Sequence, residues 1–423
     1  MNSELFYRLI SIIFLFIIAE VTAYFGILSL LRKKHKTIIF TYVRRYWLFT
    51  IVFVVIVFPL FFYTAFTKGG SIEILRYNFF IAAIIILVYL TKLLIGLSWL
   101  FSILLFFIIN SINKILLKNN EIVNNINIKI QYILNFLGLI LSIVLAIVII
   151  YGMSYGTSDF KIKNIEIEFD NLPHDFDGFK IIQISDTHLG SFNRPYLVKK
   201  GLKYISLNKP DLIVFTGDLI NVDPLEAAEY VEMFNELKPP YGKYAVLGNH
   251  DMDDFFKWEL NNVNSDSSTG DKVTYILSKM GFITLRNQSD IIHKGQDSIA
   301  ITGIDSWGKP PFKKYADINK AIKGFNTVKF KILLSHNPEV LENNILPYYN
   351  FDLTLSGHTH AMQMGFNFNK VKWSPASLKY KYYMVLYKIK NSYLYVNQGF
   401  GYIGFSARIG LYPEITVITL KRK

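Results

Sequence analysis

Five short motifs in the second half of this 423-residue chain combine side chains that bind metal ions. They supply carboxylates, imidazoles and an amide, and each motif follows a run of apolar residues. In chain order the motifs are Asp186-Thr187-His188, Gly217-Asp218, Gly248-Asn249-His250-Asp251, Ser335-His336-Asn337 and Gly357-His358-Thr359-His360. Oxygen and imidazole ligands without thiolate suit borderline divalent ions such as Mn, Fe or Zn, and the chain contains no Cys.

The motifs are rich enough in ligands for a site with two metal ions. An Asp between two ions can bridge them at the spacing of about 3.5 to 4 Å that such sites use. Two ions lower the pKa of bound water and stabilise the oxygens that gain charge when water attacks phosphorus. Five of the eight histidines fall in the motifs, which favours ligation over ordinary packing, whereas His35, His174 and His293 lie elsewhere. The residues therefore predict hydrolysis of a phosphoester.

The apolar runs before the motifs predict buried strands. They cover residues 180–184, 212–215, 244–247, 331–334 and 353–355. Runs of this length are typical of strands, and open α/β sheets bind ligands beyond the carboxyl ends of their strands. A Gly precedes the ligand in three motifs, where it would let the backbone approach a crowded centre.

The five blocks occur in the order found in calcineurin-like metallophosphoesterases, and the segment from about Ile165 to Leu420 resembles that family. With its apolar N-terminal region, the whole chain resembles the bacterial branch related to transmembrane proteins with a metallophosphoesterase domain. This resemblance implies a metal-dependent phosphoric ester hydrolase with two divalent ions. It places Asp186, His188 and His360 on the first ion, Asn249, His336 and His358 on the second, Asp218 between them, and His250 as the catalytic residue that acts on the transition state or leaving oxygen.

The resemblance also implies the fold. We expect an α/β phosphoesterase domain in residues 156–423, built as a four-layer αββα sandwich with two central sheets flanked by helices. An all-α transmembrane region of about four helices in residues 1–155 would precede it. Helices are predicted at 194–207, 224–237 and 272–280, and a flexible loop near the site at 261–270.

Departures from relatives bear on the substrate. Protein Ser/Thr phosphatases of the superfamily carry an Arg shortly after the bridging Asp, and this chain does not, so that activity is disfavoured. Asn221 stands where many relatives have an Asp that supports the catalytic His. UDP-2,3-diacylglucosamine hydrolases of lipid A synthesis, which resemble this chain but typically have Arg at His250, remain an alternative. A catalytically inactive membrane scaffold is an alternative of another class, although no ligand position is lost.

Three further features accompany the motifs. Asp251 and Asn221 are candidates for supporting the site. Arg408 could bind substrate phosphate through its bidentate fork, or could form a structural ion pair with Glu414 or a neighbouring residue. The segment from Phe366 to Tyr383 is rich in Lys and aromatic residues. It could be a solvated strand pair, cover the site, or dip toward lipid headgroups.

The first 155 residues have a different composition. Apolar stretches at about 5–31, 46–66, 79–109 and 130–151 each reach the roughly 20 residues needed to cross a bilayer. The third is too short for two crossings, so we expect one tilted helix. This region holds 13 Lys and Arg but only 4 Asp and Glu, which is +9 of the formal net charge of +13. The basic residues therefore flank membrane spans, and no nucleic-acid partner is expected.

Loop charge predicts the orientation. The first connection carries six basic residues, so the positive-inside rule places it in the cytoplasm. Four crossings then put the catalytic domain outside the cytoplasm, anchored in the inner (plasma) membrane. A hairpin in the third stretch would reverse this. The expected partners are the lipid bilayer and a phosphoester substrate that is lipid-linked or close to the membrane. Substrate identity and oligomeric state stay open.

Two charged residues fall within the spans. Glu20 and Lys92 lie near the middle of the first and third apolar stretches. An unpaired charge at that depth costs at least about 2.5 to 3.5 kcal/mol on insertion scales. We therefore predict an ion pair between them.

Overall fold

The computed structural model describes residues 3–31, 72–116, 120–252, 268–308, 313–323, 328–368 and 371–423, together with several positions between 41 and 56. The chain divides into two compact units. The first comprises residues 1–66 and 80–151, and the second comprises residues 67–79 and 152–423.

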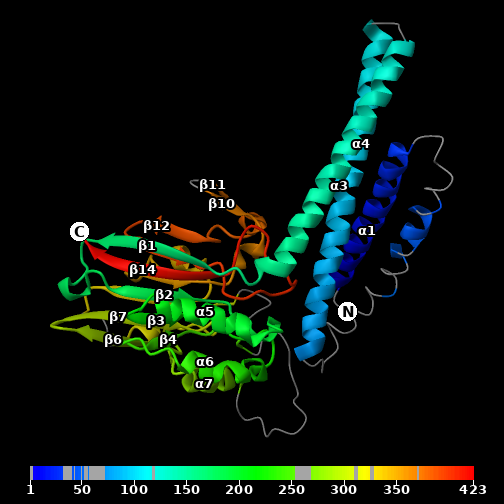
Figure 1. Ribbon diagram of the computed structural model, residues 1–423. Helices are drawn as coiled ribbons and strands as arrows, with labels where there is room; N and C mark the ends of the chain where they lie inside the picture. Colours follow the sequence, from blue (N-terminus) through cyan, green and yellow to red (C-terminus); the bar gives the residue numbers. More distant parts are fainter. Residues whose placement is uncertain are drawn as a thin grey trace. The chain divides into compact units, whose positions relative to one another are not determined.

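Long apolar helices build the first unit. They are α1 (Ser3–Leu30), α3 (Ile72–Leu116) and α4 (Asn120–Tyr151), each labelled in Figure 1. Among the described residues, these three helices are long and apolar enough to cross a membrane. The single helix expected for residues 79–109 is confirmed, because α3 runs through this stretch without a break. The expected span at 46–66 falls largely outside the described residues.

Small residues let the helices of the first unit approach each other closely. A Cβ on Gly96 would lie 2.1 Å from the Thr22 hydroxyl oxygen, and one on Gly138 would lie 2.0 Å from that of Ser98. The Ser142 hydroxyl donates to the carbonyl oxygen of Thr91 at 2.6 Å. Small residues and interhelical hydrogen bonds are the usual means of packing helices in lipid.

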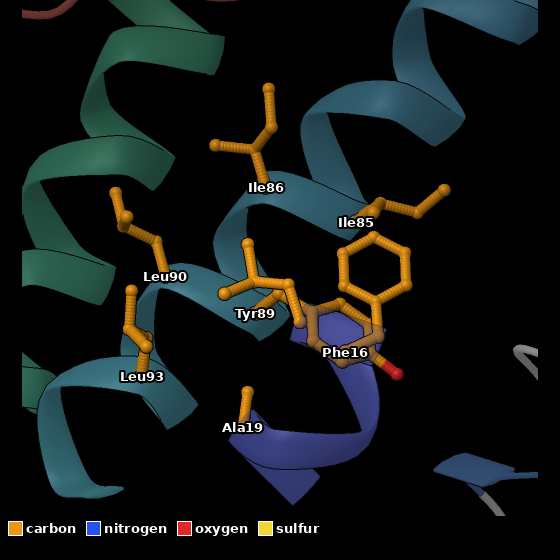
Figure 2. Close-up of a pocket in the computed structure, with 8 residues that line it drawn as sticks. Phe16, Ala19, Ile85, Ile86, Tyr89, Leu90 and Leu93 are labelled. Carbon is orange, nitrogen blue, oxygen red and sulfur yellow. The ribbon is translucent and has the colours of Figure 1, made fainter. Parts of the chain in front are cut away.

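An apolar pocket of about 210 Å³ lies in this unit, between α1 and α3. Figure 2 shows side chains of both helices around it, with the rings of Phe16 and Tyr89 stacked at a centroid distance of 4.1 Å. Its lining consists of aliphatic and aromatic side chains.

The predicted pair of charges in the first unit is confirmed. Lys92 Nζ donates to the two Glu20 carboxylate oxygens at 2.7 and 2.8 Å, and to Thr50 Oγ1 at 3.1 Å. Tyr89 adds a hydrogen bond to Glu20 at 2.9 Å. Both charged side chains are almost fully buried. Each lies against the opposite charge of the other, which compensates it in the absence of water.

Replacing one member of this pair should lower the unfolding free energy more than replacing both. We expect Glu20→Leu or Lys92→Met alone to lower the unfolding free energy by about 3 kcal/mol, because each strands a buried charge. The double variant should recover most of that loss. Thermal unfolding of the four proteins in one detergent gives the comparison, and additive losses would show that the two charges act independently.

Two six-stranded sheets form the centre of the second unit. The first has the order β1-β14-β2-β3-β4-β5 and the second β12-β13-β9-β8-β7-β6. The strands of the first are β1 Lys161–Phe169, β2 Lys180–Ile184, β3 Leu212–Phe215, β4 Lys243–Ala245, β5 Ile283–Thr284 and β14 Glu414–Arg422. Those of the second are β6 Gln288–Lys294, β7 Asp297–Ile304, β8 Lys331–Ser335, β9 Leu353–Ser356, β12 Val385–Ile389 and β13 Ser392–Val396.

Alternating side chains of the strands fill separate apolar layers, because successive residues of a strand point to opposite faces. Ile181 joins the cluster shared by the two sheets, which also contains Ile301 and Leu334 of the second sheet. Ile182 joins a cluster with α5 (Pro195–Leu207), α6 (Val231–Asn235) and α7 (Thr269–Lys279). Leu333 packs with α8 (Ile318–Ala321) and neighbouring turns. The expected mixed α/β domain is therefore confirmed.

Two expected elements differ from the structure. Residues 224–237 do not form one helix: a 3-10 helix at Pro224–Tyr230 precedes the short α6, because a buried Glu226 carboxylate ties back to the preceding loop. Of the loop expected at 261–270, residues 261–267 lie outside the described residues. Its last two residues already belong to α7, which Ser268 caps.

Candidate metal centre

The five motifs meet because their strands are parallel neighbours. β2 pairs with β3 and β3 with β4 in the first sheet, and β8 pairs with β9 in the second. Parallel neighbours end at the same edge of a sheet, so their carboxyl-terminal loops converge. Four of the five strands predicted from the apolar runs are confirmed, whereas β4 covers residues 243–245 instead of the predicted 244–247. Both sheets contribute candidate ligands.

The first group of candidate ligands contains Asp186, His188 and His360, all buried. His188 Nε2 lies 3.0 Å from His360 Nε2, and His360 Nε2 lies 3.2 Å from Asp186 Oδ1. The carbonyl oxygen of Ile220 accepts a hydrogen bond from His188 Nδ1 at 3.0 Å. Since Nδ1 carries the hydrogen, His188 Nε2 presents its lone pair to the group.

The second group centres on Asp218 and His336. His336 Nε2 lies 3.2 Å from Asp218 Oδ2, 3.1 Å from Asn249 Oδ1 and 3.2 Å from His358 Nδ1. His336 Nδ1 donates to the carbonyl oxygen of Thr216 at 2.8 Å, which again directs the Nε2 lone pair inward. Asp218 Oδ2 also lies 3.6 Å from His188 Nε2, so this carboxylate joins the two groups.

These donors fit metal ions. Lone pairs that face one another at about 3 Å repel unless a proton or a metal ion lies between them. Bonds of about 2.0 to 2.2 Å from one ion to nitrogen and oxygen place adjacent ligands roughly 3 Å apart. The spacings in both groups match that geometry, and the donor types are those of borderline divalent ions.

Several candidate ligands have an unusual backbone conformation. The φ angles of Asp186, His188, Asp218, His358 and His360 are 52°, 42°, 60°, 73° and 49°. Positive φ is uncommon outside Gly, and such strain concentrates at functional sites where the surroundings enforce it. The fold therefore holds these side chains in directions that relaxed loops would not give.

Two of the motif glycines are needed for close approach. A Cβ on Gly248 would lie 2.1 Å from Asp218 Oδ1, and a Cβ on Gly357 would lie 2.2 Å from Asp186 Oδ2. Any side chain at either position would displace a candidate ligand. This agrees with the role expected of these glycines from the sequence.

The carboxylates and imidazoles of the centre shift one another's pKa values. Burial alone would raise the pKa of Asp186, but the neighbouring His360 holds it at about 2. Burial alone would lower the pKa of His336, but Asp218 outweighs this and raises it to about 9. Burial and the charge of His336 lower the pKa of His358 to about 3. The carboxylates and imidazoles of the centre therefore shift one another's pKa in opposite directions.

Asp251, a candidate supporting residue, is buried behind the candidate ligands. Its carboxylate accepts hydrogen bonds from the backbone amides of Gly248, Asp218 and Leu219 at 2.8 to 2.9 Å. Burial and the Asp218 charge raise the pKa of Asp251 to about 7, against the effect of these amides. The residue fixes two ligand-bearing loops to each other.

His250 lies beside the ligand groups and belongs to neither. Its ring is edge-on to that of His188, with centroids 5.0 Å apart. Its Nδ1 donates to the backbone carbonyl oxygen of Asn221 at 2.8 Å. The sequence suggested that the Asn221 side chain would orient this imidazole. Instead the side chain interacts with Ser191 and Glu226, and the main chain supports the His.

Glu226 also belongs to the site, although the sequence motifs did not predict it. Its buried carboxylate accepts from the backbone amides of Asn221, Val222 and Asp223 at 2.6 to 2.9 Å, and from the Asn221 side chain at 3.0 Å. It thereby holds the loop whose carbonyl group supports His250. The sequence feature that could have indicated its role is the spacing of Asp223 and Glu226, which form a capping box.

We expect Glu226→Gln to lower kcat about 10-fold while leaving KM and metal content unchanged. An amide cannot accept all four hydrogen bonds, so the Asn221 carbonyl would shift and misdirect His250. Glu232→Gln, in the following helix α6, is the control. Steady-state kinetics with metal analysis gives the measurement, and a wild-type kcat would show that this loop needs no support from Glu226.

Arg408 is fully buried next to the centre. Its Nε donates to Gly401 O at 2.8 Å, and its Nη2 donates to Gln398 O at 2.8 Å and lies 3.5 Å from His360 Nδ1. Burial lowers its pKa to about 10. No ion pair with Glu414 occurs among the described residues. A contact with substrate phosphate stays a prediction, and the visible role of Arg408 is to hold the loop behind His360.

Comparisons with known proteins agree with this geometry. Residues 179–362 match the calcineurin-like phosphoesterase family. The chain is 33% identical over 256 residues to the uncharacterized metallophosphoesterase YkuE of Bacillus subtilis, covering 59% of this chain and 82% of that protein. It is 28% identical over 283 residues to the transmembrane protein with metallophosphoesterase domain of Danio rerio, covering 64% and 60%.

A third relative has a named substrate. Over 232 residues the chain is 29% identical to the UDP-2,3-diacylglucosamine pyrophosphatase LpxG of Chlamydia trachomatis, covering 46% of this chain and 68% of that protein. The resemblance inferred from the five motifs is confirmed by these relatives. This chain is a member of the calcineurin-like metallophosphoesterase family.

Proposed function

We propose that this protein is a membrane-anchored two-metal phosphoesterase that hydrolyses a lipid-linked or membrane-proximal phosphoester. One observation carries the proposal: Asp218 lies between two groups of buried nitrogen and oxygen atoms that are spaced about 3 Å apart. The apolar helices support the anchor, and we propose residues 1–155 as the membrane region and 156–423 as the catalytic domain.

Each side chain has a defined task in this proposal. Asp186, His188 and His360 would hold one divalent ion, and Asn249, His336 and His358 would hold the other, with Asp218 contributing to both. The ions, for which Mn, Fe and Zn all suit the donors, would polarise water and stabilise the phosphoryl oxygens. His250 holds a proton for the leaving oxygen. Because the Asn221 carbonyl accepts Nδ1–H, the proton would be donated from Nε2 of the imidazolium form of His250.

Hydrolysis of a UDP-diacylglucosamine-type pyrophosphate is the second candidate. It is favoured by the similarity to LpxG, although His250 stands where soluble enzymes of that activity typically carry Arg. Both candidates use the same metal centre. They differ in the side of the membrane on which the substrate lies and in the leaving group of the hydrolysis.

A metal analysis followed by a substrate panel tests the proposal. We expect the purified full chain to bind two Mn per molecule and to hydrolyse bis(p-nitrophenyl) phosphate, with lipid phosphodiesters, phosphomonoesters and UDP-diacylglucosamine as the decisive substrates. Preference for the UDP lipid would establish the second candidate. Absence of both metal binding and hydrolysis would leave an inactive membrane scaffold.

The side of the membrane decides which substrates are available. We expect residues 156–423 to lie outside the cytoplasm, because six basic residues in the first connection favour a cytoplasmic position and four spans were predicted. A phosphatase reporter fused after Lys423 should be active and a fluorescent protein fused there should be dark. The reverse pattern would place the centre in the cytoplasm and favour the UDP lipid.

A further inference from the structure

A two-stranded ribbon next to the metal centre has an exposed apolar face. It consists of β10 (Phe366–Phe368) and β11 (Val371–Trp373), labelled in Figure 1. Phe366 pairs with Trp373 and Phe368 with Val371, so all four side chains lie on one face of the ribbon. Their exposed fractions are 47%, 46%, 74% and 63%.

The opposite face fastens the ribbon to the catalytic unit. Lys372 Nζ lies 3.9 Å from the ring centroid of Tyr387, and the Tyr383 hydroxyl donates to the Lys372 carbonyl oxygen at 3.4 Å. Gly365, which directly precedes β10, donates its backbone amide hydrogen to Ile409 O at 2.9 Å. The apolar face is therefore presented by an anchored element. Contiguous apolar surface of this kind marks an interaction site in soluble and membrane-associated proteins.

The composition of this segment matches a lipid surface. Between residues 366 and 381 the chain has four Lys and neither Asp nor Glu. Aromatic and basic residues together are typical of segments that sit among headgroups, where rings enter the interface and ammonium groups meet anionic lipid. About ten residues separate α4 from β1, a reach of at most roughly 35 Å, so membrane helices of the same chain keep a bilayer close by.

We propose that the face formed by Phe366, Phe368, Val371 and Trp373 docks into the headgroup region of the bilayer. The ribbon begins only a few residues after the candidate ligand His360. Docking would therefore bring the metal centre to the lipid surface and favour phosphoesters held there. That consequence rests on the proposed function, whereas the docking itself does not.

Spin labels can test the docking in the full chain. Since the protein has no Cys, Phe368→Cys and Val371→Cys each introduce a single labelling position on exposed side chains. Tyr348→Cys, at an apolar side chain that is 75% exposed elsewhere in the unit, is the control. The chelated protein is reconstituted at one copy per nanodisc containing anionic lipid. Power saturation then compares collisions with oxygen and with a water-soluble nickel chelate.

Labels at 368 and 371 should collide with oxygen several-fold more, relative to nickel, than the label at 348. Equal accessibility at the three positions would overturn the proposal. A parallel preparation with two copies per disc is the comparison: shielding that appears only there, together with dipolar broadening, would assign the face to a second copy and would overturn the proposal as well. Spin-label accessibility is measured without substrate turnover. A failure of the docking proposal can therefore be distinguished from a lack of phosphoesterase activity.

Discussion

Asp218→Asn should abolish metal-dependent hydrolysis, lowering kcat/KM by at least about 10³-fold. The Asp218 carboxylate lies within 3.6 Å of His188 on one side and within 3.2 Å of His336 on the other. It also accepts the His250 amide hydrogen at 2.9 Å, which a neutral Asn would bind less strongly. Removal of this charge should weaken the binding of both ions.

The measurement is hydrolysis of bis(p-nitrophenyl) phosphate with Mn, accompanied by metal analysis of the same preparation. Asp170→Asn, whose side chain is exposed on the surface of the same unit, serves as the control and should behave as wild type. Chelation of the wild-type protein should reproduce the loss, and added Mn should reverse it. Full activity in the Asp218 variant or in chelated protein would rule out a two-metal centre.

His250→Ala should lower kcat by about 10²-fold or more and leave metal content near wild type. The structure keeps this imidazole outside both ligand groups and fixes its Nδ1 on a backbone carbonyl, which suits proton donation from Nε2. His293→Ala, at a surface histidine outside the motifs, is the matched control. His188→Ala provides the contrast, since it should lose metal.

The loss in the His250 variant should be greatest for substrates with poor leaving groups, because these need a proton most. A p-nitrophenyl ester should therefore be affected less than an alkyl phosphodiester. Loss of a metal equivalent in His250→Ala would make this residue a ligand instead of a proton donor.

Local sequence determined much of the catalytic unit. β2 and β3 occupy the predicted residues, because short runs of β-branched and aliphatic residues favour central strands that are buried on both faces. The motifs at their ends identified the family. The Glu20–Lys92 pair was also predictable, since an isolated charge within a membrane span has few alternatives to a partner of opposite sign.

Other features depend on contacts between residues far apart in the chain. The positive φ angles of Asp186 and His358 occur in loops at the ends of strands from different sheets, and a local sequence pattern does not specify such strained conformations. Glu226 acts on His250 through the main chain of Asn221, which carries no side-chain signature in the sequence. The apolar face of the β10–β11 ribbon depends on strand register. The sequence by itself therefore determined which residues could bind metal, whereas tertiary structure decided how they are aimed and supported, because direction is set by packing of distant segments.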